Sequence, residues 1–172
     1  MVGDVLRIGV TGHRVLADPA GVAAAVDAVL DDLGRAGVVF EVLSLLAEGA
    51  DRVVTERAMR RAGSRYVAIL PLDPADYATD FEDPASAAAF ERLLASAERV
   101  EVARPDDSTD TSREAAYERA GHAVVKASDV LLALWDGGAS RGRGGTAEMV
   151  AYARARGVRV EVVPVNRQEV QA

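Results

Sequence analysis

The hydrophobic positions of the chain fall into two alternating patterns. Short, continuous apolar runs rich in β-branched residues are typical of buried strands, and they occupy residues 5–10, 38–46, 66–70, 100–103, 130–135 and 158–163. Stretches with apolar residues at helical spacing separate them and predict helices at residues 22–36, 51–62, 85–97, 112–127 and 146–156. Residues 72–86, which are polar and contain Pro74 and Pro84, predict a loop before the third helix.

The strand runs are continuously apolar rather than alternating, which indicates a sheet covered on both faces. Strands that alternate with helices predict parallel pairing. We therefore expect an α/β protein with a Rossmann-like, doubly wound and mostly parallel sheet of five to six strands, with helices on both faces. We expect one domain over residues 1–166 and a flexible tail at residues 167–172.

Composition narrows the function classes. A chain of 172 residues that is 49% hydrophobic suits one domain with a sizeable core. The absence of cysteine excludes thiolate nucleophiles, cysteine metal ligands and disulfides. A formal net charge of -7 argues against an extended nucleic-acid surface and against binding to anionic membranes. The first residues lack the features of a signal peptide and no apolar run is long enough to span a membrane, so we expect a cytoplasmic protein.

In parallel α/β sheets, ligands bind outside the carboxyl ends of the strands. Four loops of this chain are expected at that edge, namely residues 11–14, 47–51, 71–72 and 136–145. Within them, the candidate ligand contacts outside the glycine-rich segment are Gly12, Arg14, Gly49 and Asp136.

The fourth loop ends in the segment RGRGGT, residues 141–146. Glycines at Gly142, Gly144 and Gly145 let a backbone approach a ligand closely, and Thr146 is a candidate cap for the helix that follows. The start of a helix attracts anions through its free amides and its dipole. The segment therefore predicts a phosphate or carboxylate site, unless its glycines only make a flexible connection.

Two arginines lie within this segment. Arg141 or Arg143 would bind a phosphate in a forked geometry, or both are solvated. Residues 142–147 also satisfy the spacing G-x-G-x-x-A. A dinucleotide fingerprint belongs to the first strand–helix turn of its unit, whereas this segment lies before the last predicted helix, so we reject that interpretation. No P-loop sequence is present.

Five segments together resemble the SLOG superfamily of Rossmann-like domains: IGVTGHR, LLAEGADR, ILPL, SDVLLALWDG and GRGGTAEMVAYARARG. This superfamily includes DNA-processing SMF/DprA proteins, LOG phosphoribohydrolases that activate cytokinins, and bacterial domains thought to sense or process nucleotides. The resemblance covers nearly the whole chain and implies a small-molecule, nucleotide-type ligand and a homodimer. We expect no further cofactor and no metal.

The LOG enzymes carry a P-G-G-x-G-T-x-x-E motif whose glutamate is functional. Aligned on Gly145 and Thr146, this chain has Glu148 one position early and Met149 where the motif glutamate belongs. One residue is a rotation of about 100° on a helix, so glycosidic cleavage is doubtful. Glu148 either accepts hydrogen bonds from ribose hydroxyls or is an ordinary acid of a first helical turn.

Other charged residues near the expected edge leave alternatives open. Arg14 is either a phosphate clamp or the partner of Glu48, Asp51 or Asp136 in a salt bridge. His13 without a placed acid is expected in a pocket wall or at the surface. Glu48 and Asp51 either divide acid and base roles or are acids at a helix start.

Two further groups favour structural explanations. Aromatic residues at Tyr77, Phe81, Phe90 and Tyr117 either cover a base or pack between helices. Three aspartates, Asp106, Asp107 and Asp110, lack the glycine and glutamate of a calcium loop and predict a solvated segment.

Three function classes follow from the sequence. The favoured one is a domain that binds a nucleotide or a nucleotide-derived metabolite as a sensor or carrier, with phosphate on the glycine-rich loop. The alternative is a LOG-like nucleoside 5′-monophosphate phosphoribohydrolase or a related enzyme that cleaves N-glycosidic bonds, with Glu148 and Glu48 as candidate catalytic residues. A protein-only scaffold is the third.

Overall fold

The structure of the chain is a computed structural model that describes residues 3–105 and 110–166. The expected tail at residues 167–172 and the aspartates Asp106 and Asp107 lie outside the described residues.

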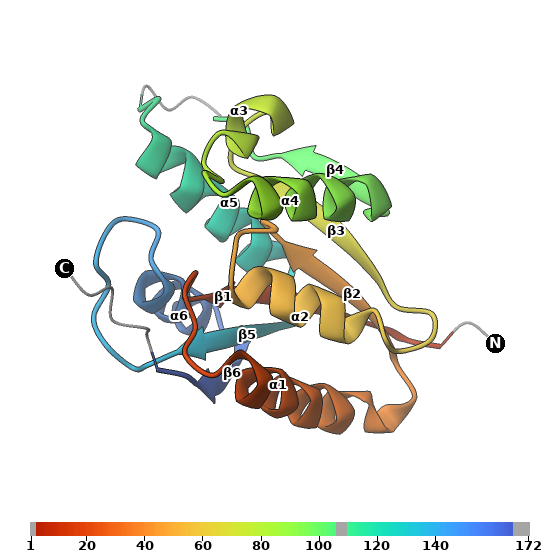
Figure 1. The fold of residues 1–172 in the computed structure, drawn as a ribbon. Helices are drawn as coiled ribbons and strands as arrows, with labels where there is room; N and C mark the ends of the chain where they lie inside the picture. Colours follow the sequence, from red (N-terminus) through yellow and green to blue (C-terminus); the bar gives the residue numbers. More distant parts are fainter. Residues whose placement is uncertain (1–2, 106–109, 167–172) are drawn as a thin grey trace.

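The fold is built on a twisted parallel sheet (Figure 1). Within the described residues, six strands form this sheet in the order β4-β3-β2-β1-β5-β6, and every neighbouring pair is parallel. Their bounds are Val5–Gly12 (β1), Val39–Ser44 (β2), Arg65–Leu70 (β3), Arg99–Val102 (β4), Val130–Trp135 (β5) and Arg159–Pro164 (β6). The Rossmann-like α/β architecture is thus confirmed.

Helices cover both faces of the sheet (Figure 1). One face carries α1 (Pro19–Leu33), α2 (Ala50–Ala58), α3 (Pro74–Ala78) and α4 (Pro84–Ser96), and a short 3-10 turn (Gly34–Ala36) follows α1. The other face carries α5 (Arg113–Ala127) and α6 (Thr146–Ala155), which pack against each other. The larger apolar core lies under α1, α2 and α4, and smaller clusters lie under α5 and α6.

Several boundaries differ from the predicted ones because of local chemistry. The β1 strand continues through Thr11 and Gly12, since both pair with β5. The first helix begins at Pro19, three residues earlier than predicted, because Asp18 caps it by accepting a hydrogen bond from the Gly21 amide at 3.1 Å. The predicted loop at residues 72–86 contains α3, which begins at Pro74, a residue suited to the first helical position.

The two outer strands share the sequence Arg-Val-Glu-Val, at residues 99–102 and 159–162. In each, the arginine pairs with the glutamate two residues on, with nitrogen–oxygen distances of 2.6 Å for Arg99–Glu101 and 2.5 Å for Arg159–Glu161. Charged pairs along an outer strand discourage pairing with another sheet. The same four-residue sequence therefore protects both edges of the sheet from pairing with another sheet.

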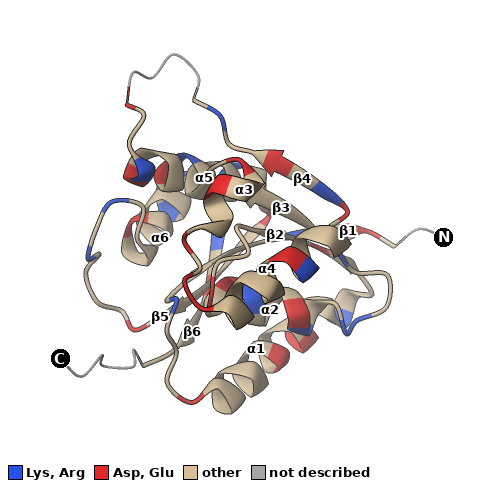
Figure 2. Ribbon diagram, turned by 45° about the horizontal axis from the view of Figure 1, so that its top comes forward, with Lys and Arg blue, Asp and Glu red and all other residues tan. Residues whose placement is uncertain are grey.

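Several helices carry charged residues of both signs. Figure 2 shows basic and acidic positions together on α2, α4 and α5. Among the described residues, none of the helices has the length and apolar character needed to cross a membrane.

Candidate functional site

The strand order changes direction between β1 and β5, because the chain adds β2, β3 and β4 on one side of β1 and β5 and β6 on the other. Loops that leave the carboxyl ends of such neighbouring strands diverge and open a crevice. Three adjoining hollows lie at this edge, and Arg14 and Tyr117 border all three. We call them together the cleft.

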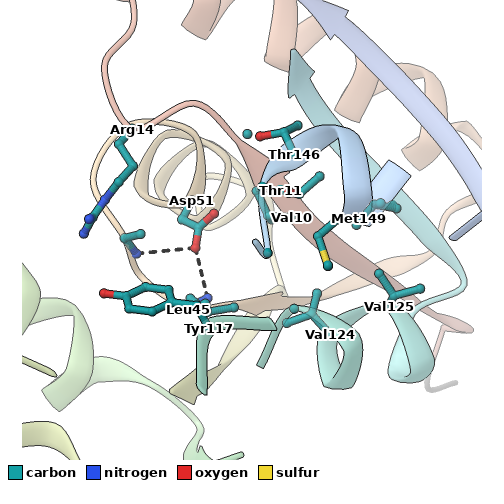
Figure 3. A pocket seen from close by; sticks show the side chains of 16 residues that line it. Val10, Thr11, Arg14, Leu45, Asp51, Tyr117, Val124, Val125, Thr146 and Met149 are labelled. Atoms are coloured by element: carbon teal, nitrogen blue, oxygen red, sulfur yellow. Dashed lines mark hydrogen bonds between the residues drawn. The ribbon is translucent and has the colours of Figure 1, made fainter. Parts of the chain in front are cut away.

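The inner cavity of the cleft has a volume of about 200 Å³ and lies between the ends of β1 and β2 and the helices α5 and α6 (Figure 3). Its floor is apolar and includes Val124, Leu131 and Met149. Its polar groups lie at one side and include Thr11, Arg14 and Asp51. A few polar groups beside an apolar floor are typical of small-molecule sites.

The outer hollow, of about 540 Å³, is bordered by residues 12–15, by Tyr117 and by the whole segment 140–146. The glycine-rich loop and the start of α6 thus face the cleft. The predicted cap, Thr146, is already the first helical residue of α6. The cap residue is Gly145, which has no side chain to accept a hydrogen bond from the helix amides. Because the first amides of a helix have no acceptor within it, the start of α6 presents hydrogen-bond donors at this hollow.

Gly144 adopts a left-handed backbone conformation with φ at 77°. A Cβ atom at this position would lie 3.2 Å from the amide nitrogen of Glu118 on α5. Any side chain here strains the loop by itself. A substitution of Gly144 therefore tests loop geometry rather than ligand contact.

Glu148 and Met149 point in different directions from α6. The Glu148 carboxylate accepts a hydrogen bond from the Gly144 amide at 2.6 Å, and Glu148 lines none of the three hollows. Met149 is buried and lines the inner cavity, where a Cβ on Gly121 would lie 2.5 Å from its sulfur. The position that faces the cavity therefore carries a thioether, and the carboxylate braces the loop.

The two arginines of the loop differ in their partners. Arg143 forms salt bridges with Glu118 of α5 and with Asp110, the latter at 2.5 Å. These bonds tie the loop to α5 and occupy the guanidinium group. Arg141 is exposed, borders the outer hollow and forms no ion pair among the described residues.

Arg14 lies in the loop between β1 and α1 and is exposed. Of the salt bridges expected with Glu48, Asp51 or Asp136, none is formed among the residues that the structure describes. Its guanidinium carbon lies 5.7 Å from the centroid of the Phe81 ring. The positive charge of Arg14 is therefore not neutralised by a paired carboxylate within the described part of the chain.

His13 and Asp136 join the ends of β1 and β5. The Asp136 amide donates to Nε2 of His13 at 3.1 Å, and the Asp136 carboxylate lies 3.2 Å from the same nitrogen. An acid is thus placed beside His13, contrary to the sequence expectation. His13 borders the outer hollow, whereas Asp136 lines none of the three and accepts a bond from Gly138 instead.

Glu48 and Gly49 follow β2. The Ser86 hydroxyl of α4 donates to the Glu48 carboxylate, which lines none of the three hollows. Gly49 packs against the loop after β1, because a Cβ at this position would lie 2.3 Å from the Arg14 carbonyl oxygen. Pro71 and Leu72, after β3, line none of the hollows either.

Asp51 is the acid that the structure brings to the inner cavity. It lies in the first turn of α2, is only 7% exposed, and accepts hydrogen bonds from the amides of Leu45 at 3.1 Å and Ala47 at 3.4 Å. Burial raises its pKa to about 6, against the lowering effect of these bonds and of the Arg14 charge. The sequence left Asp51 open as an acid–base partner of Glu48, a salt-bridge partner of Arg14 or an acid at a helix start. Its burial depends on packing, which periodicity does not report.

The aromatic residues mostly form core. Tyr77, Phe81 and Phe90 are buried and meet at centroid distances of 5.0 to 5.3 Å. Tyr117 borders the cleft, and its hydroxyl donates to Asp80. Helix packing therefore accounts for three of the four, and Tyr117 remains the candidate for contact with a ligand.

No family model matches the sequence, and no curated protein matches it significantly. Among solved structures, the chain is similar to the Moco carrier protein of Chlamydomonas rheinhardtii. The two are 16% identical, the match covers 94% of this chain and 77% of that one, and the TM-score is 0.44. At this level the likeness bears on neither ligand nor activity.

Proposed function

We propose that the protein binds a nucleotide or a nucleotide-derived metabolite, as a sensor or carrier domain, with phosphate at the start of α6. One observation carries the proposal: the amides at the start of α6 and the Arg14 side chain border the same outer hollow, where the strand order reverses. The helix dipole places about half a positive charge at this point.

The charges around the hollow support an anion rather than a cation at this position. Arg14 and Arg141 border the outer hollow without ion pairs among the described residues. Arg143, in contrast, forms salt bridges with two carboxylates and connects the loop to α5. We therefore assign the phosphate contact to Arg14 and the amides at the start of α6, with Arg141 as an additional cation.

The inner cavity adjoins this anion site and has an apolar floor. A ligand that combines a phosphate with a larger uncharged part fits this arrangement better than a free phosphate does. The resemblance of the sequence to the SLOG superfamily agrees with such a ligand, and membership in that superfamily is part of the proposal.

An N-glycosidic hydrolase is the alternative. Such chemistry builds positive charge on the sugar and needs a carboxylate against it. Met149 faces the inner cavity, and the Glu148 carboxylate is bound to the Gly144 amide outside it. This arrangement supports binding over catalysis.

Isothermal titration calorimetry with inorganic phosphate and AMP tests the proposal. We expect AMP to bind more tightly than phosphate, and Arg14→Gln to weaken both by about tenfold to a hundredfold, the effect of one charged hydrogen bond. Arg14 lies at the surface without an ion pair among the described residues, so its replacement should leave the fold intact.

Arg60→Gln is the matched control, because Arg60 is also exposed but follows the end of α2, at the opposite edge of the sheet. It should bind both ligands as the unmodified protein does. If neither phosphate nor AMP binds at millimolar concentration, or if Arg14→Gln and Arg60→Gln behave alike, the proposed site is wrong.

A further inference from the structure

The inner cavity has an acidic wall that the proposed phosphate site does not use. Asp51 reaches this wall from the start of α2, opposite the apolar floor formed by α5 and α6 (Figure 3). A buried carboxyl group beside an empty apolar space is costly unless its oxygens find donors. The distribution of those donors around Asp51 is uneven.

Both amide bonds to Asp51 go to the same oxygen, Oδ2, from Leu45 and Ala47. The other oxygen points away from these amides, on the side of Val10 and Thr11 of β1, which line the same cavity (Figure 3). The Ser44 side chain at the end of β2 contributes to lowering the pKa of Asp51 and accepts a hydrogen bond from the Leu46 amide at 3.0 Å. Two fixed amides therefore orient the carboxyl group and leave Oδ1 on the cavity side.

We propose that Asp51 binds a ribose hydroxyl of the ligand through Oδ1 and so selects ribonucleotides over ligands that lack this hydroxyl. The assignment rests on the proposed function, because the phosphate at the start of α6 would hold the sugar beside the cavity wall. Arg14 borders both the inner cavity and the outer hollow, so one side chain spans the two subsites.

The surroundings of Asp51 make the contact sensitive to pH. The charged or titratable groups that face it are Arg14 from the β1–α1 loop, Tyr77 from α3 and, across the cavity, Tyr117 from α5. Burial raises the pKa of both tyrosines above the ordinary value, so they remain neutral around pH 7. Asp51 itself, with its pKa raised to about 6, changes from a neutral acid to a charged acceptor between pH 5 and pH 7.5.

The test is calorimetry with AMP, 2′-deoxy-AMP and 3′-deoxy-AMP, which share the phosphate and the base and differ by one hydroxyl. At pH 7.5, at least one deoxy analogue should bind about tenfold or more weakly than AMP, as expected for loss of a hydrogen bond to a charged group. At pH 5 this ratio should fall towards the few-fold effect of a neutral hydrogen bond. Ionisation of the phosphate cancels in the ratio.

Asp51→Asn is the variant of choice, because its amide oxygen can still accept from Leu45 and Ala47 while an NH₂ group replaces Oδ1. We expect the ratio between AMP and the deoxy analogue to drop to about threefold or less and to lose its pH dependence. Binding of the deoxy analogue itself should change little. Asp129→Asn is the control, because Asp129 is an exposed aspartate just before β5 that accepts a hydrogen bond from the Arg7 amide of β1. This variant should retain the full ratio between AMP and the deoxy analogue.

The outcomes separate the two proposals. If the unmodified protein binds all three nucleotides equally, the Asp51 assignment is wrong and the phosphate site stands. If Asp51→Asn retains the ratio and its pH dependence, the hydroxyl is bound elsewhere. If none of the nucleotides binds, the proposed function fails and takes the Asp51 assignment with it.

Discussion

Replacement of Asp51 by asparagine should stabilise the unliganded protein at neutral pH. Burial raises the pKa of Asp51 from 3.8 to about 6. The folded state therefore holds this proton more tightly than the unfolded state does, and stability falls as pH rises from about 4 to about 6. Above this range both states are ionised, and the folded state carries the full cost of the buried charge.

The size of the effect follows from the same numbers. A rise in the pKa from 3.8 to about 6 corresponds to a free energy of about 3 kcal/mol. Asp51 is so deeply buried that screening by solvent lowers this free energy only slightly. Asparagine has nearly the same shape, can keep both amide bonds and carries no charge. For a domain of this size, about 3 kcal/mol corresponds to an increase in Tm of about 6 to 12 °C.

Thermal and urea denaturation at pH 7.5 and at pH 4, in buffer without phosphate, measure this difference. We expect the gain in Asp51→Asn to be largest at pH 7.5 and to shrink below about 1 kcal/mol at pH 4, where Asp51 of the unmodified protein is protonated in the folded state and partly protonated in the unfolded state. Asp129→Asn, the same change at an exposed site, should show no such gain. A variant that is no more stable than the unmodified protein at pH 7.5, or whose gain is the same at both pH values, would refute the reasoning.

Three other predictions follow from the site and the surface. Gly121→Ala should push the Met149 side chain into the inner cavity, since the new Cβ would lie 2.5 Å from its sulfur, and calorimetry should show weaker AMP binding with little change in phosphate binding. Hydrolysis of AMP should be slow or absent, and Glu148→Gln should leave free-base release unchanged; robust release abolished by this substitution would assign catalysis to Glu148. The protein should form a homodimer, as the superfamily resemblance implies, and light scattering that gives 18.1 kDa at about tens of micromolar would contradict this.

The predicted dimer surface changes once burial is known. From the sequence alone, the alanine-rich faces of the helices predicted at residues 85–97 and 112–127 suit close packing against a second copy. In α5, however, Ala115, Ala116 and Ala120 are buried within the chain itself. Exposed alanines remain on α4, at Ala85 and Ala88, so α4 is now the better candidate for contact between copies.

Periodicity predicted the sheet and its covered faces because continuous apolar strands leave few alternatives. It missed α3, since a five-residue helix that begins at Pro74 has too few apolar positions to show a period. It also stopped β1 at Val10, because glycine and threonine are typical of turns, whereas pairing with β5 keeps Thr11 and Gly12 in the strand. Short-range chemistry is visible in a sequence, but strand pairing between distant segments is not.

The sequence predicted which site residues lie near one another where their position depends only on which loops meet at one edge of the sheet. The glycine-rich segment, Gly12 and Arg14 meet at one cleft, as expected from strands that end at the same edge. The partners of charged side chains were not predictable, because they depend on side-chain reach across elements. Arg143 is held by acids on another segment, and Glu48 turns towards Ser86 of α4.

The glutamate of α6 stands one position before the place of the LOG motif glutamate, and this displacement is why we expect binding rather than catalysis in this cleft. On α6, the rotation of about 100° between neighbours sends Met149 into the cavity and Glu148 to the loop amide. A carboxylate for the sugar would therefore have to come from the opposite wall, where Asp51 is fixed by two amides. A fixed acceptor at that wall suits recognition of a hydroxyl, whereas stabilising a developing positive charge requires a carboxylate against the anomeric carbon itself. If AMP were hydrolysed after all, loss of the activity in Asp51→Asn but not in Glu148→Gln would place the chemistry on α2 rather than on α6.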